Sequence, residues 1–186
     1  GLSMVTLYYI RRYIHFLQPL MRELDQAGVV SAEVFTWLEE TVAALRAAQP
    51  QLAGGRCTDE QRYALLEQLG QAASRYRETV YLQDGFSGSR QLEIGLVHEL
   101  LDSALAAVDH SIASNRNEDG LYNAYNLLDI APGSAAIDTL YPMLEGQVAA
   151  LSSGAIEAEE AVQLLQTLFA SPLYRADQKS FILYPD

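Results

Sequence analysis

Apolar residues recur at spacings of three and four along most of this chain, and this pattern constrains the fold more than any other feature. In VTLYYIRRYIHFLQPLMRELDQ, residues 5–26, such a stripe runs through Ile10, Tyr13, Ile14, Leu17, Met21 and Leu24. The spacing predicts a helix that buries one face against its neighbours. Pro19 should kink this helix or divide it in two, and Gly28 should end it.

Five further helices are predicted from the same periodicity and from local start and stop signals. The second covers residues 32–49, with Ser31 as its N-cap. The third begins at the capping box Thr58-Asp-Glu-Gln61 and runs to Val80, since the hydroxyl and the glutamine side chain can each satisfy a free amide.

The second half of the chain continues in the same way. Ser89 is expected to cap the fourth helix, and a short helical piece is expected at residues 122–129. A fifth helix covers roughly 135–152, with Pro142 either starting its second half or kinking it. The sixth covers 158–171, and the tail after it can be extended.

Six helices joined by short loops predict an all-α fold, an antiparallel array of about six helices arranged as a bundle or as stacked hairpins. The sequence contains no fixed repeat and no clean linker, so we expect a single domain over residues 1–186. The chain opens GLSM and stops just after an apolar run, and we therefore expect a fragment of a longer protein.

The charge balance limits the partners that this chain can take. Asp and Glu number 24 against 12 Lys and Arg, which gives a formal net charge of -12. Such a surface repels phosphate backbones and anionic lipid, so neither nucleic acid nor membrane is expected as a partner. A lone cysteine, Cys57, has no internal disulfide partner and suits a reducing compartment, so we expect a cytoplasmic location.

The segment SNRNEDGLYNAYN, residues 114–126, concentrates amides, charges and tyrosines in one place. One interpretation is a site for a hydroxylated, sugar-like ligand, because planar amides, carboxylates and an arginine give directional bonds while aromatic rings cover apolar sugar faces. We expect this connector to be an exposed polar surface. The candidate ligand-binding residues are Asn115, Arg116, Asn117, Glu118, Asp119, Tyr122, Asn123, Tyr125 and Asn126.

Two other interpretations of this segment stay open. Asn115-x-Asn117-x-Asp119-Gly120 matches the first half of a calcium loop, but Asn126 stands where a bidentate glutamate normally closes the site. Alternatively, Asn and Asp are common in caps and turns, and the tyrosines can simply pack. We predict no metal site and no cofactor.

Three stretches carry a resemblance to a known family: DGLYNAYNLL (119–128), LYPMLEGQVAALSSG (140–154) and SPLYRADQKSFILYPD (171–186). They resemble stretches of large, poorly characterised bacterial proteins of the six-hairpin glycosidase type. The resemblance also includes FSGSRQL and the helix ending in VDHSI, and it spans about residues 75–186. It implies a carbohydrate-active parent protein, and it assigns no catalytic role to particular residues.

We therefore expect a non-catalytic or incomplete helical region of a larger carbohydrate-active protein, which contributes sugar-binding polar residues. No catalytic residues are predicted, because no activated nucleophile is evident in the sequence. The alternative is a helical interaction module that docks on a partner protein or on a neighbouring domain of the parent. An intact small enzyme is a third hypothesis, and it requires a deep pocket with two convergent carboxylates.

Overall fold

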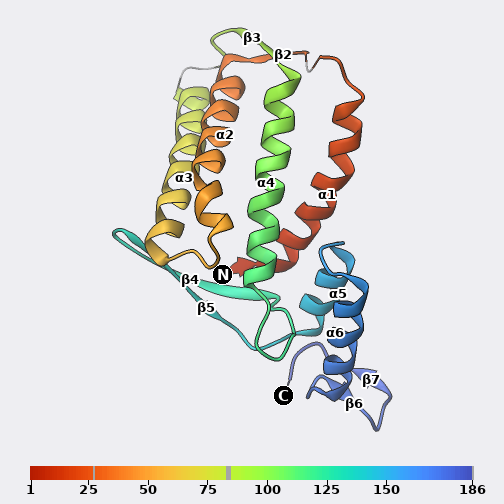
Figure 1. Ribbon diagram of the computed structural model, residues 1–186. Helices are drawn as coiled ribbons and strands as arrows, with labels where there is room; N and C mark the ends of the chain where they lie inside the picture. The colour runs from red at the N-terminus through yellow and green to blue at the C-terminus, as the bar shows by residue number, and fades with distance from the viewer. Residues whose placement is uncertain (27, 83–84, 186) are drawn as a thin grey trace. The chain divides into compact units, whose positions relative to one another are not determined.

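The computed structural model describes residues 1–26, 28–82 and 85–185, and Ala27, Gln83, Asp84 and Asp186 lie outside the described residues. Its helices are α1 (Met4–Arg22), α2 (Ala32–Ala53), α3 (Asp59–Leu82), α4 (Ile94–Ser114), α5 (Leu144–Ser152) and α6 (Ala158–Ala170) (Figure 1). Its strands are β1 (Leu2–Ser3), β2 (Gly28–Ser31), β3 (Ser89–Leu92), β4 (Tyr125–Ala131), β5 (Ser134–Thr139), β6 (Tyr174–Arg175) and β7 (Ser180–Phe181). The prediction of a mainly helical chain with about six helices is confirmed. The stricter all-α prediction is wrong, because three small sheets accompany the helices in the part of the chain that the structure describes.

The chain divides into two compact units. Unit 1 contains Gly1–Tyr13, Val108–Ile130 and Ala136–Asp186, whereas unit 2 contains Ile14–Ala107 and Ala131–Ala135. The prediction of one domain over residues 1–186 stays a prediction. Within the described ranges, none of the helices has both the length and the apolar character needed to cross a lipid bilayer.

The helical hairpin of α2 and α3 in unit 2 follows the predicted start signals. Ser31 caps α2 by accepting a hydrogen bond from the Val34 amide at 3.2 Å. The Thr58 amide donates to Gln61 Oε1 at 2.9 Å, and the Gln61 amide donates back to Thr58 Oγ1 at 3.2 Å. Both caps are confirmed, and the two helices lie side by side in Figure 1.

The predicted cap of the fourth helix is wrong. Ser89 lies in β3, where it pairs with Ser31 of β2, and α4 begins only at Ile94. Pairing with β2 satisfies the backbone of this segment, so it does not enter a helix. Leu92, the last residue of β3, packs with Phe35 and Leu38 of α2 in a buried apolar cluster.

Two predicted helical segments in the middle of the chain are strands. Residues 122–129 and the first half of 135–152 contribute to β4 and β5, which extend a sheet in the order β1-β4-β5. The turn between them contains Pro132 and Gly133, with Gly133 at φ +79°. Proline followed by a left-handed glycine is typical of a tight turn, so this pair reverses the chain before a helix can form.

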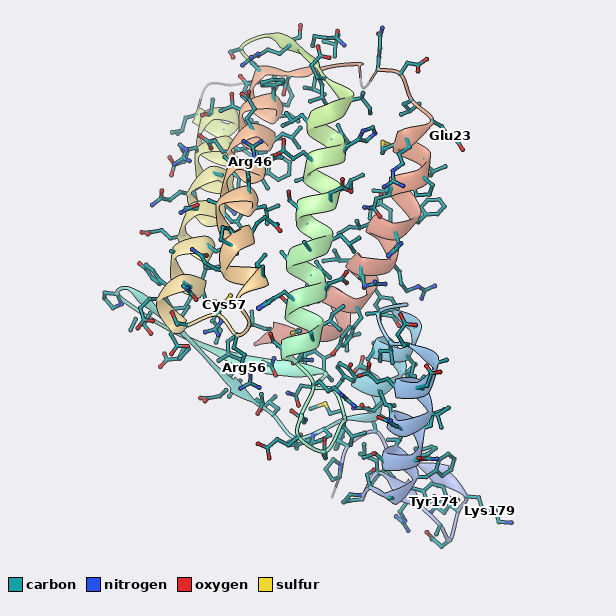
Figure 2. All side chains as sticks on the ribbon, in the orientation of Figure 1. Glu23, Arg46, Arg56, Cys57, Tyr174 and Lys179 are labelled. Atoms are coloured by element: carbon teal, nitrogen blue, oxygen red, sulfur yellow. The ribbon has the colours of Figure 1, made fainter. Side chains whose placement is uncertain are left out.

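The C-terminal part of unit 1 is closer to the prediction. The helix α5 starts at Leu144, just after Pro142, and α6 covers the predicted sixth helix. The tail after α6 is partly extended, because β6 and β7 pair antiparallel with Tyr174 opposite Phe181. Figure 2 shows Tyr174 and the only lysine, Lys179, in this blue C-terminal hairpin.

The buried face of α1 differs from the predicted apolar stripe. Ile10 and Tyr13 are exposed, whereas Tyr8, Arg11 and Ile14 are buried. The predicted stripe is right at Ile14 and wrong at Ile10 and Tyr13, and it left out Arg11, whose charge is compensated inside the fold. Moreover, α1 runs through Pro19 without a break, so the proline does not divide it. The helix has already ended at Arg22 when the chain reaches Gly28.

Candidate functional site

The polar segment 115–126 connects α4 to β4, entirely within unit 1. Its first half is a tight turn, in which the Asn117 amide donates to the Leu121 carbonyl at 2.8 Å. Asp119 Oδ1 accepts from the Leu121 amide at 2.9 Å, and Gly120 has the positive φ of +86° that such a turn requires. Some of the polar groups of the segment therefore form hydrogen bonds that stabilise the turn of the segment itself.

Three of the asparagines lie in the interior of unit 1. Asn115, Asn123 and Asn126 are 4%, 1% and 5% exposed. The Asn115 amide donates to the Tyr8 hydroxyl at 2.6 Å and to the Asn123 carbonyl at 2.8 Å, and Asn126 donates to Asn115 Oδ1 at 2.9 Å. The expectation of an exposed polar surface is wrong for these residues, because they are buried and form hydrogen bonds within the protein.

The remaining asparagine is also engaged within the segment. Asn117 donates to Asn123 Oδ1 at 2.9 Å, and Asn123 donates back to Asn117 Oδ1 at 3.1 Å. These oxygens would be ligands in a calcium loop, and such a loop also needs a second helix where this chain has β4. Among the residues that the structure describes, no group of three or more His, Cys, Asp or Glu could hold a metal ion.

The side chain of Gln147, in α5, forms hydrogen bonds with the backbone of Tyr122 in the polar segment. Its Oε1 accepts from the Tyr122 amide at 2.8 Å, and its Nε2 donates to the Tyr122 carbonyl at 2.6 Å. The neighbouring Gly146 allows this close approach, since a Cβ there would lie 2.8 Å from the Ala124 nitrogen. Gln147 was not among the residues predicted from the sequence, although the Gly-Gln pair inside an apolar helix is a local signal for it.

A cavity of about 420 Å³ lies beside this segment within unit 1. Two candidate residues, Arg116 and Tyr122, reach it, and both interact there with Glu160 of α6. The Tyr122 hydroxyl donates to Glu160 Oε1 at 2.7 Å, and Arg116 Nε lies 3.1 Å from the same oxygen. The full lining is Arg11, Asp109, Ile112, Ala113, Arg116, Tyr122, Ala155 and Glu160.

Arg11 and Asp109 form a second ion pair in the lining of this cavity. Arg11 is only 8% exposed, and its Nε donates to Asp109 Oδ1 at 2.5 Å. A second nitrogen donates to the Ser153 carbonyl at 2.9 Å. Gly154 lies close to this guanidinium, because a Cβ at residue 154 would be 3.3 Å from Arg11 Nη1. A charge inside an apolar stripe was the sequence signal for Arg11, whereas Asp109 and Glu160 carried none.

Burial raises the pKa values of two tyrosines of this region above their ordinary value. It raises the pKa of Tyr122, and the hydrogen bond to Glu160 raises it further. Burial also raises the pKa of Tyr8 to about 12. Both hydroxyls therefore keep their protons around neutral pH and act as hydrogen-bond donors.

The other candidate residues lie apart from the cavity lining. Glu118 and Asp119 are exposed, and Asp119 serves the turn described above. The Tyr125 hydroxyl donates to Glu145 Oε2 at 3.2 Å, and burial followed by this bond raises its pKa. The structure thus brings two of the nine candidates to a cavity and uses most of the others as internal structure.

The sequence was also compared with known proteins. No protein-family model matches it, and no curated protein matches it either.

Proposed function

We propose that this chain is a mainly helical, non-catalytic region of a larger carbohydrate-active, glycosidase-like protein. In this proposal, the cavity of unit 1 binds a hydroxylated, sugar-like ligand. The observation that carries it is that Arg116 and Tyr122, two predicted binding residues, line one cavity together with Glu160. The proposal includes a cytoplasmic location and contacts with other domains of the parent protein.

The chemistry of the lining suits hydroxyl groups. A sugar hydroxyl both donates and accepts, so its site needs carboxylate oxygens as well as N–H or O–H groups. Glu160 and Asp109 supply the acceptors, whereas Arg116 and Tyr122 supply the donors. A volume of about 420 Å³ falls within the usual range for small-molecule sites.

The arrangement supports binding more than catalysis. Glycoside hydrolysis requires one carboxyl group that gives a proton and a second that acts as base or nucleophile. Here each carboxylate already accepts from an arginine, Asp109 from Arg11 and Glu160 from Arg116. Such paired carboxylates serve more readily as fixed acceptors than as proton donors.

Calorimetric titration of the chain with a panel of mono- and oligosaccharides tests this proposal. We expect one sugar class to bind, and we expect Glu160→Gln and Tyr122→Phe each to weaken binding about tenfold, since each removes a hydrogen-bonding group at the cavity. Glu159→Gln is the matched control, because the exposed neighbour on α6 does not line the cavity. The absence of binding to every sugar, or equal binding by all three variants, would contradict the proposal.

A second candidate, the helical interaction module, is favoured by exposed apolar side chains on α6. Val162, Leu165 and Phe169 are 54%, 41% and 54% exposed and recur at helical spacing. If the partner that docks on this face is a second copy of the chain, sedimentation should show concentration-dependent association that the double variant Val162→Gln, Leu165→Gln abolishes. A chain that stays monomeric at all concentrations would count against an interface between copies on this face.

A further inference from the structure

A second cavity lies in unit 2, between α2 and α3, and it is independent of the polar segment. It measures about 250 Å³, and its lining comes from α2, from α3 and from the loop that precedes β3. The chemistry-bearing residues of this lining are Glu33, Trp37, Glu40, Arg75, Tyr76 and Ser87.

Glu33 is the unusual member of the lining. It is 7% exposed, and its Oε1 accepts from the Ser87 amide at 2.8 Å and from the Ser87 hydroxyl at 2.5 Å. Its other oxygen, Oε2, is buried and has no hydrogen-bond partner among residues 1–26, 28–82 and 85–185. A buried carboxylate oxygen without a donor is costly, so a protein rarely keeps one without a use.

The carboxyl group of Glu33 carries its charge at neutral pH. The Ser87 hydroxyl, followed by the Ser87 amide, lowers the pKa of Glu33 below its usual value. Glu40 adds a second carboxylate to the lining, and it pairs with Arg75 at 3.0 Å. Two carboxylates and one guanidinium leave the side chains of the lining with one excess negative charge, part of which the N-terminal turn of α2 around Glu33 offsets.

Aromatic side chains stand next to this charge. Trp37 follows Glu33 by four residues on α2 and therefore shares its face of the helix. The Trp37 and Tyr76 rings lie 6.1 Å apart between centroids, so both helices contribute an aromatic surface. Aromatic faces beside a carboxylate attract organic cations through the ring quadrupole.

We propose that the cavity between α2 and α3 binds an organic cation with a primary ammonium group, which donates to Glu33 and lies against Trp37 and Tyr76. A neutral ligand leaves the excess charge unbalanced, and an anion is repelled by it. The ammonium supplies both the missing N–H donor and the balancing charge. A free alkylamine or a lysine side chain provides this chemistry, and the experiment below separates the two sources.

Trp37 is the only tryptophan in the chain, so its fluorescence reports on this cavity alone. The chain is titrated with n-butylammonium chloride at constant ionic strength, and with tetramethylammonium and 1-butanol as comparison probes. We expect a saturable change with n-butylammonium, about tenfold weaker binding of tetramethylammonium, which has no N–H, and no binding of 1-butanol. Nα-acetyl-lysine methylamide is a further probe, which represents a lysine side chain within a protein. Tighter binding of this probe than of n-butylammonium indicates that the natural ligand is a lysine side chain, and weaker binding indicates a free amine.

Variants test the role of Glu33 directly. Glu33→Gln keeps an acceptor for Ser87 but removes the charge, and we expect it to weaken n-butylammonium binding about tenfold or more. Glu67→Gln removes the same charge from an exposed position on α3 outside the lining, and we expect no change. Circular dichroism establishes that each variant is folded.

Three results would overturn the proposal: a fluorescence change that does not saturate, one that sodium chloride reproduces, or equal binding by Glu33→Gln and the wild type. If Glu33→Gln fails to fold, the wild type alone still tests the proposal. Binding of 1-butanol to the wild type as tightly as n-butylammonium would contradict the proposal. The site lies in unit 2 and takes a cation, so failure of the sugar titration leaves this proposal unaffected.

Discussion

The polar segment of unit 1 and the cavity of unit 2 both combine acidic, arginine and tyrosine side chains, but they differ in how their buried polar groups are satisfied. In the segment, Asn115 and Asn123 make several hydrogen bonds within the protein. In the cavity of unit 2, Glu33 has a charged oxygen without a partner among the described residues. A dense group of polar residues can therefore be internal structure as readily as a site, whereas a charged oxygen without a hydrogen-bond partner in the lining of a cavity points to a ligand.

One atom qualifies this contrast. Asn126 Oδ1 in unit 1 is also buried without a hydrogen-bond partner in the described part of the chain. It is a neutral amide oxygen, and Asn126 does not line the cavity of unit 1. Glu33 Oε2 differs in both respects, because it belongs to an ionised carboxylate that lines a cavity. Four predictions test whether the two regions differ as this comparison states.

The largest effect on stability is expected from Asn115→Ala. The change removes the donor to Tyr8 and the acceptor for Asn126, so buried polar groups lose their partners. We expect the free energy of unfolding in urea to fall by about 2–4 kcal/mol. Ser114→Ala, at the exposed neighbouring position, should change it by less than about 0.5 kcal/mol. Equal effects of the two changes would show that the amide network does not stabilise unit 1.

The second prediction concerns alkaline pH. The pKa of Tyr8 is raised from 10.0 to about 12, so the unfolded chain loses this proton at lower pH than the folded chain. The contribution of Tyr8 to the free energy of unfolding is therefore fully present below pH 10 and is lost as the pH rises through about 12. This loss lowers the free energy of unfolding by about 2–3 kcal/mol. Unfolding titrations across this range should show the loss, and Tyr8→Phe should reduce it. Tyr81→Phe is the control, because Tyr81 is 80% exposed. A profile that Tyr8→Phe leaves unchanged would assign the alkaline loss to other groups.

The third prediction tests the close packing of α5 against the segment. Gly146→Ala places a Cβ 2.8 Å from the Tyr122 carbonyl and from the Ala124 nitrogen, both of which are backbone atoms. We expect the free energy of unfolding to fall by about 1–3 kcal/mol. Gly70→Ala in α3 has open space around the new methyl group and should stabilise the chain by up to about 1 kcal/mol. Thermal unfolding measures both, and a stabilising Gly146→Ala would refute the close approach.

The smallest effect on stability is expected at Glu33. Glu33→Gln keeps an acceptor for the bonds from Ser87 and removes a charged oxygen, Oε2, that has no hydrogen-bond partner among the described residues, so the free energy of unfolding should change by less than about 1 kcal/mol. Urea unfolding at neutral pH measures this. A loss as large as that of Asn115→Ala would mean that Glu33 is structural, and the contrast between the two regions would disappear.

The local features of the fold were predictable from the sequence. The caps at Ser31 and Thr58 and the sixth helix are set by residues within one or two turns of each other, so a pattern in the chain is sufficient. The site was only partly predictable. Arg116 and Tyr122 were among the candidates, but their partner Glu160 lies 38 residues after Tyr122 and carries no local signal.

The failures share one physical cause. The β4–β5 hairpin and the β2–β3 ribbon depend on pairing between strands, and a short apolar segment is compatible with either strand or helix until its partner is known. Pro132-Gly133 is the one local signal for the hairpin, and it lies between the two segments that the sequence predicted to be helical. The face of α1 was misassigned because a buried arginine is acceptable only when its partners are in place.

The sequence by itself determined where most helices form and the excess of negative charge, because periodicity, caps and composition are properties of the chain alone. Only the tertiary structure decided which polar residues are internal bonds and which line a cavity. Ser87 meets Glu33 across 54 residues, and Gln147 meets Tyr122 across 25. Whether a polar group is satisfied depends on such distant partners, and that is a property of the folded chain.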